Sequence, residues 1–387
     1  MAPSQEASGV AQPTKSLRGL GVGLLLVLGG ALSASCKADA PKPSAESGTA
    51  TASKPASEAA AVAPASAGPA LTIAYSDWPG WVAWDIGLKK GWFDAAGVKV
   101  DFKWFEYVPS MEAFSAGKVD AVAMTNGDQL VTGASGAPSV ALLLNDYSNG
   151  NDMIVAKAGI ESLEQLKGKK IGVEVGFVSH LLLLNALKQA KLSDKDIEIV
   201  NVPTDQTPQA LKSGSVDAIV AWQPNSGQAL REVAGSKAIF TSANLPGIIY
   251  DVLAVNPKSL AERQPDWEKV AGVWFQIVDY IQEEKNKDDV LSIMSARVGL
   301  SPEQYAGLMK GTFFLDAEGN AKHYRQGDSL ESVFFSSKMV DGFNIEHGVY
   351  KVSQKPESYL NADSITKLAA KSAVAPAVSP AAPAVAK

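Results

Sequence analysis

Four acidic side chains stand in short candidate segments at or near the ends of predicted strands, and these segments contain no Lys or Arg. The four residues are Asp77, Asp128, Glu174 and Asp251. An anionic ligand needs helix amino ends, Arg or Lys to satisfy its charge, and an uncompensated anion among carboxylates is strongly disfavoured. The segments therefore favour a cation or a neutral hydrogen-bond donor, such as guanidinium or an amide, over nitrate. Taurine carries charges of both signs and stays open.

Two tryptophans near the first of these segments are candidate walls for a ligand. The segment 76–80 contains Pro and Gly, which predict a turn, and a helix should begin near Trp81. Trp78 and Trp81 either offer a flat apolar or cation–π surface or pack in the core. Trp84 is predicted to be a core residue, because tryptophan side chains are mostly buried. The predicted ligand contacts in this part of the chain are Ser76, Asp77, Trp78 and Trp81.

Further candidate contacts come from segments later in the chain. Asn126 and Asp128 either cap the helix that follows them or reach a ligand from the carboxyl end of a strand. Ser179 is predicted to be a helix cap or a ligand donor. Four residues near the predicted crossings between lobes either line a cleft or hold a hinge in place: Asp146, Ser148, Asn149 and Asp251. The predicted contacts here are Thr125, Asn126, Asp128, Glu174, Ser179, His180, Trp222, Gln223 and Asp251.

The residues give little support to catalysis or to a metal centre. His180, His323 and His347 lack metal-ligand spacing, and no carboxylate in a recognisable context makes Ser179 and His180 part of a catalytic triad. No glycine-rich phosphate loop follows a predicted strand, since the Gly-x-Gly-x-Gly run at 19–23 lies in the amino-terminal segment. We therefore predict a non-enzyme with no catalytic residues, no metal and no cofactor.

The candidate segments belong to a duplicated unit. Residues 113–124 and 210–221 both carry a Gly two residues before Val-Asp-Ala and an apolar run after it, so Asp217 repeats Asp120 after 97 residues. A similar strand, loop and helix precede each copy. One β-α-β-α-β unit used twice predicts two lobes that face each other across a cleft. Open α/β sheets bind ligands at the carboxyl ends of their strands, which places the candidates in that cleft.

Short apolar runs alternate with amphipathic ones, which predicts βαβ units with largely parallel sheets. Beyond Asn256 the pattern becomes helical. Crossings near 149–152 and 245–247 place lobe one at 70–152 plus 247–362, with the extra carboxyl-terminal helices, and lobe two at 153–246. Two crossings suit hinge closure around a ligand. The predicted strands are Leu71–Tyr75, Val98–Phe105, Ala121–Met124, Val140–Leu144, Met153–Ala156, Lys170–Val175, Glu198–Val202, Ala218–Trp222, Ala238–Thr241 and Ile249–Val255.

Both ends of the chain are predicted to lie outside the lobes. Residues 1–35 combine positive charge with an apolar stretch too short to span a membrane, which indicates a signal peptide. Cys36, the only cysteine, follows a lipobox-like segment and is predicted to be lipidated; simple secretion is the alternative. The Ala/Pro/Ser-rich tether 36–69 and the tail 373–387 are predicted to be disordered, because they hold too little apolar surface. The net charge of −6, without a basic stripe, gives no sign of a nucleic-acid partner.

Several motifs carry a resemblance to a known family: Trp81–Trp84, Tyr147–Asp152, Val178–Leu181, Trp222–Pro224 and Phe343–Gly348. From about Leu71 to Gly348 the chain resembles substrate-binding proteins of ABC importers with the type II periplasmic-binding-protein fold. Within them it resembles the nitrate/taurine/sulfonate/thiamine-precursor clan, and most of all the branch associated with urea-carboxylase-type gene clusters. The resemblance implies an α/β fold of two lobes, each a mostly parallel sheet flanked by helices.

The same resemblance implies a function. It indicates a monomeric periplasmic or cell-surface protein that binds a small polar nitrogen compound of the urea, amide or guanidine type between its lobes. A permease and its ATPase would be its partners, and a lipid anchor its contact with the membrane. The alternatives on this fold are a binder of taurine, alkanesulfonate, nitrate or aminopyrimidine, a ligand-sensing protein, and a pyrimidine-forming enzyme.

Overall fold

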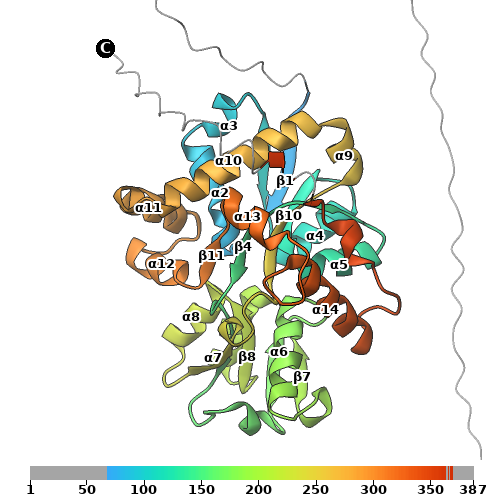
Figure 1. Ribbon diagram of the computed structural model, residues 1–387. Helices are drawn as coiled ribbons and strands as arrows, with labels where there is room; N and C mark the ends of the chain where they lie inside the picture. The colour runs from blue at the N-terminus through green and yellow to red at the C-terminus, as the bar shows by residue number, and fades with distance from the viewer. Residues whose placement is uncertain (1–67, 363–364, 366, 369–387) are drawn as a thin grey trace, which may run out of the picture. The chain divides into compact units, whose positions relative to one another are not determined.

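The computed structural model describes residues 68–362, 365 and 367–368 (Figure 1). The predicted signal peptide, Cys36, the tether up to residue 67 and the tail 373–387 lie outside the described residues. Within the described part of the chain, no helix is both long and apolar enough to cross a membrane.

The strands of the described residues form two separate sheets. The first contains β1 (Leu71–Tyr75), β2 (Val100–Trp104), β3 (Ala121–Thr125), β4 (Val140–Ser148), β10 (Tyr250–Val255) and β11 (Thr312–Phe314), in the order β11-β4-β10-β3-β1-β2. The second contains β5 (Asp152–Ala156), β6 (Lys170–Val173), β7 (Glu198–Asn201), β8 (Ala218–Trp222) and β9 (Lys237–Thr241), in the order β7-β6-β8-β5-β9. We call each sheet with its helices a lobe, lobe one and lobe two.

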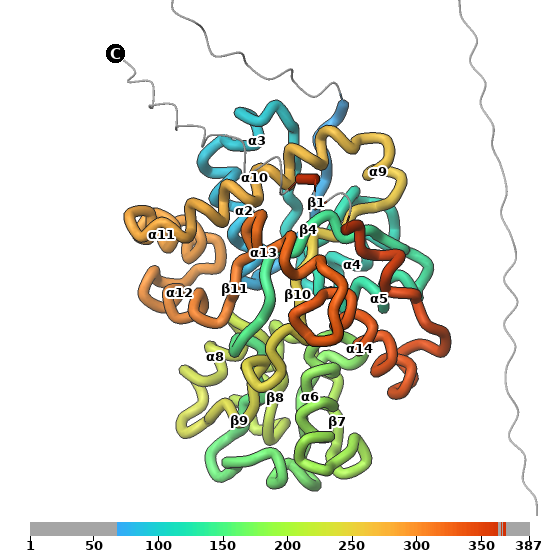
Figure 2. Tube along the Cα trace, in the orientation of Figure 1, coloured from blue at the N-terminus to red at the C-terminus, as the bar shows by residue number. Residues whose placement is uncertain are grey.

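One strand near the middle of each sheet runs against its neighbours. β10 is antiparallel to β3 and β4, and β5 is antiparallel to β8 and β9. The pairs β1–β2, β1–β3, β6–β7 and β6–β8 are parallel. β5 and β10 are the first strands after the chain passes from one lobe to the other, as the tube in Figure 2 lets the reader follow. The amino ends of β5 and β10 therefore lie at the edge where the parallel strands have their carboxyl ends.

Most helices belong to lobe one. They are α1 (Pro79–Val82), α2 (Trp84–Lys89), α3 (Trp92–Ala95), α4 (Tyr107–Ser115), α5 (Asn126–Ala134), α9 (Pro257–Glu262), α10 (Gln264–Gln282), α11 (Lys287–Arg297), α12 (Pro302–Met309), α13 (Ala317–His323) and α14 (Val333–Glu346). Lobe two has α6 (Val178–Gln189), α7 (Thr207–Ser213) and α8 (Asn225–Glu232). Trp84, predicted to be a core residue, is fully buried, and its ring centroid lies 4.6 Å from that of Trp274.

The duplicated Val-Asp-Ala element has the same structural role in both lobes. Asp120 precedes β3, and its carboxylate accepts hydrogen bonds from the backbone N and the hydroxyl of Thr72 on β1, at 2.8 and 2.7 Å. Asp217 precedes β8, and its carboxylate accepts from the backbone N of Lys170 on β6, at 2.9 Å. The repeated Asp thus joins two parallel strands at their amino ends, opposite the edge that carries the candidate ligand contacts.

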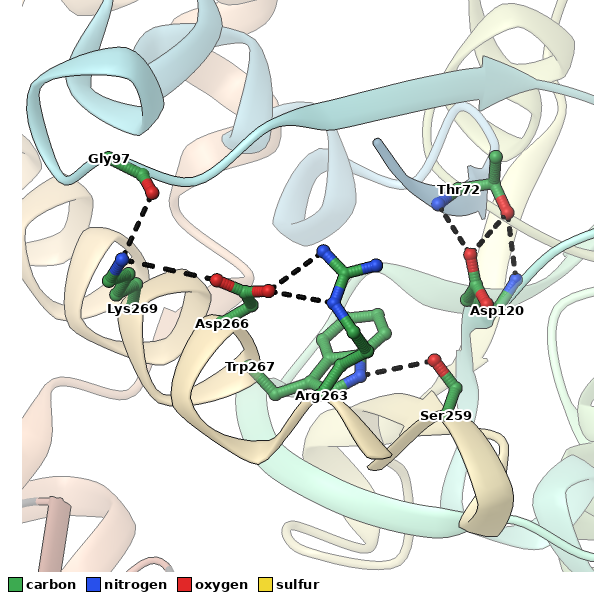
Figure 3. A network of polar contacts seen from close by, with 8 residues as sticks. All are labelled: Thr72, Gly97, Asp120, Ser259, Arg263, Asp266, Trp267 and Lys269. Atoms are coloured by element: carbon green, nitrogen blue, oxygen red, sulfur yellow. Dashed lines mark hydrogen bonds and ion pairs between the residues drawn. The ribbon is translucent and has the colours of Figure 1, made fainter. Parts of the chain in front are cut away.

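A polar network beside Asp120 fixes the long helix α10 to lobe one (Figure 3). Lys269 of α10 donates to the carbonyl of Gly97 at 3.0 Å, and Arg263 pairs with Asp266 at 2.7 Å. The indole N–H of Trp267 donates to the hydroxyl of Ser259 at 3.3 Å, which ties α10 to α9. The first two helices after the second crossing, α9 and α10, are therefore an integral part of lobe one.

Candidate ligand-binding site between the lobes

A small cavity lies where the candidate-bearing edges of the two sheets meet. We call it the inner cavity. Its volume is about 10 Å³, which is room for about one water molecule. Both lobes line it, with Trp78, Trp81, Tyr107 and Asp251 from lobe one and Asp152 and Trp222 from lobe two.

A second, larger cavity lies beside the inner one, and we call it the outer chamber. Its volume is about 380 Å³. No Lys, Arg or His is among the residues that line it. Tyr107 and Trp222 line both cavities, so the two spaces are neighbours separated by these rings. The acidic residues of the outer chamber are Asp77, Glu106 and Glu112 from lobe one and Glu174 and Asp205 from lobe two.

Aromatic rings from both lobes form the wall of the inner cavity. Trp81 stacks on Tyr107 with ring centroids 5.2 Å apart and an interplanar angle of 21°. Trp222 of lobe two meets the same Tyr107 edge to face, at 5.0 Å and 77°. The faces of these rings are apolar surfaces that can pack against a ligand or attract a cation.

Two carboxylates of lobe one hold lobe two directly. Asp77 accepts hydrogen bonds from the indole N–H of Trp222 at 3.3 Å and from the amide of Asn225 at 2.8 Å. Asp128 accepts from the hydroxyl of Tyr107 at 2.6 Å and from the backbone N of Val178, the first residue of α6, at 3.3 Å. The structure therefore shows the lobes in contact, with polar groups of one paired to polar groups of the other.

The hydrogen bond between Asp128 and the backbone N of Val178 also affects whether the amino end of α6 can bind an anion. The amino end of a helix attracts anions, because its first N–H groups are free and its dipole is positive there. In this structure a carboxylate of the protein itself takes that position. An anionic ligand would have to displace Asp128 to use it.

Four aspartates are buried around the inner cavity: Asp128, Asp146, Asp152 and Asp251, each at most 4% exposed. Asp146 and Asp251 are direct cross-strand partners on β4 and β10, and Oδ2 of each has no hydrogen-bond donor. Asp146 accepts from the indole N–H of Trp78 at 3.0 Å. Neither these four aspartates nor the acidic residues of the outer chamber form an ion pair with a Lys or Arg of the described residues.

Burial raises the pKa values of these four carboxyl groups. It raises the pKa of Asp128 to about 6 and that of Asp152 to about 7. Burial also raises the pKa of Asp146, against the lowering effect of the hydrogen bond from Trp78. The pKa of Asp251 lies well above its ordinary value because of burial first and then the charges of Asp146 and Asp152. A buried carboxylate without a cation favours its neutral form, so the cluster holds protons that a bound cation could replace.

Two of the remaining sequence candidates, Thr125 and Asn126, have partners within the protein. The hydroxyl of Thr125 accepts from the backbone N of Asp128 and caps α5, while Thr125 also lines the inner cavity. The amide of Asn126 donates to Ser336 and Ser337, and its oxygen accepts from the backbone N of Tyr250, so its polar atoms serve the core of lobe one.

The other candidates differ in their surroundings. Glu174 lines the outer chamber and accepts from the hydroxyl of Thr204 at 3.1 Å; burial raises its pKa to about 7. His180 is half-buried, accepts from the backbone N of Gly176 at 3.4 Å, and burial lowers its pKa. Ser76, Ser179 and Gln223 are buried with side-chain oxygens that have no partner, and they line neither cavity.

Sequence reasoning missed Tyr107 and Asp152. Tyr107 follows the carboxyl end of β2 by three residues, a position that the rule for open sheets could have singled out. Asp152 begins β5, and the same rule could not find it. Because β5 is antiparallel to its neighbours, its amino end lies at the carboxyl edge of the other strands, next to the cavity.

The backbone at Gly80 lies close to the side chains of Asp146 and Trp78, and this gives a first prediction. A Cβ at Gly80 would overlap Oδ2 of Asp146 and lie 2.7 Å from Nε1 of Trp78. We expect Gly80→Ala to break the Trp78–Asp146 hydrogen bond and to lower the free energy of unfolding by about 1–3 kcal/mol, as overpacking in a core does. Urea denaturation measures the change. The matched control is Gly272→Ala in α10, where no atom lies within 4 Å of the added methyl group and a gain of about 0.5–1 kcal/mol is expected. Equal effects of the two substitutions would contradict the prediction.

Comparison with known proteins agrees with this architecture. Residues 85–276 match the model of the NMT1/THI5-like family. The crystal structure of the periplasmic aliphatic sulphonate binding protein SsuA from Escherichia coli superposes with a TM-score of 0.62 and 18% identity, covering 76% of this chain and 97% of that one. The chain has the two-lobed fold of the periplasmic binding proteins. The predicted fold class and the predicted resemblance to this clan are confirmed.

Other proteins similar to this chain differ in their names. The taurine-binding periplasmic protein of Escherichia coli (strain K12) is 25% identical over 232 residues, which cover 57% of this chain and 70% of that protein. The chain spans 57% of the length of the first curated relatives that it matches. A desulfurization enzyme, DSZB, shares the fold with a TM-score of 0.56 and 14% identity, covering 78% of this chain and 99% of that one. The fold thus hosts binding proteins and an enzyme, and the residues of the site must decide between them.

Proposed function

We propose that this protein is the extracytoplasmic solute-binding component of an ABC importer. Its ligand would be a small polar nitrogen compound of the guanidine, amide or urea type, held between the lobes. The observation that carries the proposal is the set of buried aspartates around the inner cavity, none of which forms an ion pair with a Lys or Arg of the described residues. Only groups that donate hydrogen bonds or carry positive charge can satisfy such acceptors without a large desolvation cost.

Lobe closure supplies the mechanism. The inner cavity takes residues from both lobes, so a ligand makes its full set of contacts only when the lobes meet. Binding then shifts the population from open to closed molecules, because the ligand has a higher affinity for the closed form. The hydrogen bonds of Asp77 and Asp128 to lobe two add to the stability of the closed form. A permease that contacts both lobes could distinguish the loaded protein from the empty one.

Sulfonate or taurine binding is the second candidate, and the names of similar proteins favour it. The residues of this chain argue against a sulfonate group in the inner cavity. The amino end of α6 already holds the Asp128 carboxylate, and the acidic lining of both cavities would repel an anion. Taurine could place its ammonium group near the aspartates, but its sulfonate would then face the acidic outer chamber.

The proposal also covers the location of the protein in the cell envelope and its protein partners. Signal-peptide removal and lipidation of Cys36 would hold the protein at the outer face of the cytoplasmic membrane, with the segment 36–69 as a tether. There it would act as a monomer and deliver its ligand to a permease driven by an ATPase. We propose no catalytic role, because neither a nucleophile–base pair nor another catalytic arrangement is apparent from the side chains at the inner cavity.

A thermal-shift panel tests the ligand class. The melting temperature of the purified protein is measured at pH 8 with guanidinium, urea, acetamide, taurine, ethanesulfonate and nitrate, each at the same concentration and ionic strength. We expect the nitrogen donors, and guanidinium most of all, to raise the melting temperature, because a ligand that binds only the folded state stabilises it. Stabilisation by ethanesulfonate or nitrate without stabilisation by guanidinium or urea would overturn the proposal.

A further inference from the structure

We propose that the ligand carries two positive groups, a primary ammonium group in the inner cavity and a second cationic group in the outer chamber. This inference rests on the proposed binding of a polar nitrogen compound between the lobes, and it widens the ligand class from guanidines, amides and ureas to elongated dications, such as an α,ω-diamine or an amine with a guanidine group. Three features of the site carry it: the inner acceptors, the charge of the outer chamber, and the rings between them.

The inner cavity suits an ammonium group in size and in hydrogen bonding. It has room for about one water molecule, and an ammonium group is of similar size. An ammonium group donates three hydrogen bonds and accepts none. Asp152 and Asp251 line the cavity as acceptors, and Oδ2 of Asp251 is buried without any donor.

The acidic residues of the outer chamber carry negative charge that a single ammonium group in the inner cavity would not neutralise. Its acidic residues come from both lobes: Glu106 of lobe one and Asp205 of lobe two line the same space, and the charge of Asp205 raises the pKa of Glu106, after the larger effect of burial. Closing the lobes therefore brings like charges together. A cation between Glu106 and Asp205 would turn this repulsion into attraction toward both lobes.

The rings of Tyr107 and Trp222 stand between the two spaces. They line both cavities, come from different lobes and lie 5.0 Å apart in the closed structure. Opening the lobes separates the two rings, so an elongated ligand can enter before the rings close on it. Aromatic faces suit a methylene chain, which needs an apolar neighbour, and also attract the cations at its ends.

Isothermal titration calorimetry at pH 8 tests the second subsite. The ligands are α,ω-diamines of three to six carbons, each compared with the monoamine of the same length. We expect at least one diamine to bind about tenfold or more tightly than its monoamine. In the variant Glu106→Gln/Asp205→Asn the ratio of the two affinities should fall to about one. The control Glu318→Gln/Asp328→Asn removes the same charge from exposed positions outside both cavities and should keep the ratio of the wild type.

The outcomes separate this inference from the proposed function. If monoamines or guanidinium bind and no diamine binds more tightly, the second subsite is wrong and the proposed function stands. If the Glu106/Asp205 variant keeps the diamine preference, the outer chamber does not hold the second group and the inference is again wrong. If no amine, guanidinium or urea binds while ethanesulfonate does, both proposals are wrong.

Discussion

Replacing Asp251 by asparagine should lower the affinity for a cationic ligand by about 100-fold or more while making the ligand-free protein more stable. Asp251 lines the inner cavity, is 2% exposed and has an oxygen without a donor. Removing one partner of a buried charged pair costs about 2–5 kcal/mol of binding free energy. Without ligand the same carboxylate is an uncompensated buried acid, so its removal should raise the free energy of unfolding at pH 8 by on the order of 1–3 kcal/mol.

The control for Asp251→Asn is Asp120→Asn. Asp120 accepts two hydrogen bonds from Thr72 at the far ends of the strands and touches neither cavity. We expect this variant to lose stability and to keep its ligand affinity, which is the opposite pattern. Calorimetric titration with a diamine and urea denaturation measure both quantities for each variant. Wild-type affinity in Asp251→Asn, or a loss of stability like that of Asp120→Asn, would show that Asp251 does not face the ligand.

The second large effect concerns pH. The stability of the ligand-free protein should fall as the pH rises, whereas its affinity for a cation should rise. The folded pKa values of Asp128 and Asp77 are about 6 and those of Asp152 and Glu174 about 7, all above the values of an unfolded chain. Between about pH 4 and 7 the folded state therefore holds protons that the unfolded chain has released, and the free energy of unfolding falls as the pH rises. We expect the melting temperature of the ligand-free protein to fall between pH 5 and pH 8.

Cation binding should show the reverse trend, because the cation replaces protons on the buried carboxylates. We expect its affinity to rise between pH 5 and pH 8, by up to about tenfold per pH unit for each proton released. Calorimetric titration in two buffers with different ionisation enthalpies counts the protons. In Asp251→Asn fewer protons should be released. An affinity that is constant or falls over this range would mean that the buried carboxylates do not hold the ligand.

The strands were predictable from the sequence because their apolar runs are short, buried and bounded by turns. All ten predicted strands are present, and the largest change is at β4, which ends at Ser148 instead of Leu144. β11 was missed, since Thr312–Phe314 is too short to show a pattern. The helix predicted to begin near Trp81 begins at Pro79 and is divided near Ala83 into α1 and α2. The helix expected after Asn126 and Asp128 is α5, but it already begins at Asn126, because Thr125 and neither of these two residues is its cap. Its first turn, Asn-Gly-Asp, has the composition of a loop, which hid this start.

Some residues at the cavities could be predicted from a rule about strand ends, and others could not because their position depends on tertiary structure. The rule that ligands lie at the carboxyl ends of strands singled out Asp77, Glu174 and Trp222, which line the cavities. The antiparallel direction of β5 placed Asp152 there as well, and local sequence patterns do not encode strand direction. The role of Asn126 depends on Ser336 and Ser337, which are more than 200 residues away in the chain and gave no signal beside it.

A competition experiment tests the central claim most directly. The protein is incubated at pH 8 with an equimolar mixture of butane-1,4-diamine, guanidinium, urea, taurine, ethanesulfonate and nitrate, passed through a desalting column and denatured, and the released molecules are measured by mass spectrometry. If the buried aspartates select the ligand, a positively charged nitrogen compound is enriched over every other component. Enrichment of taurine, ethanesulfonate or nitrate would contradict the claim that this cleft is built for a cation.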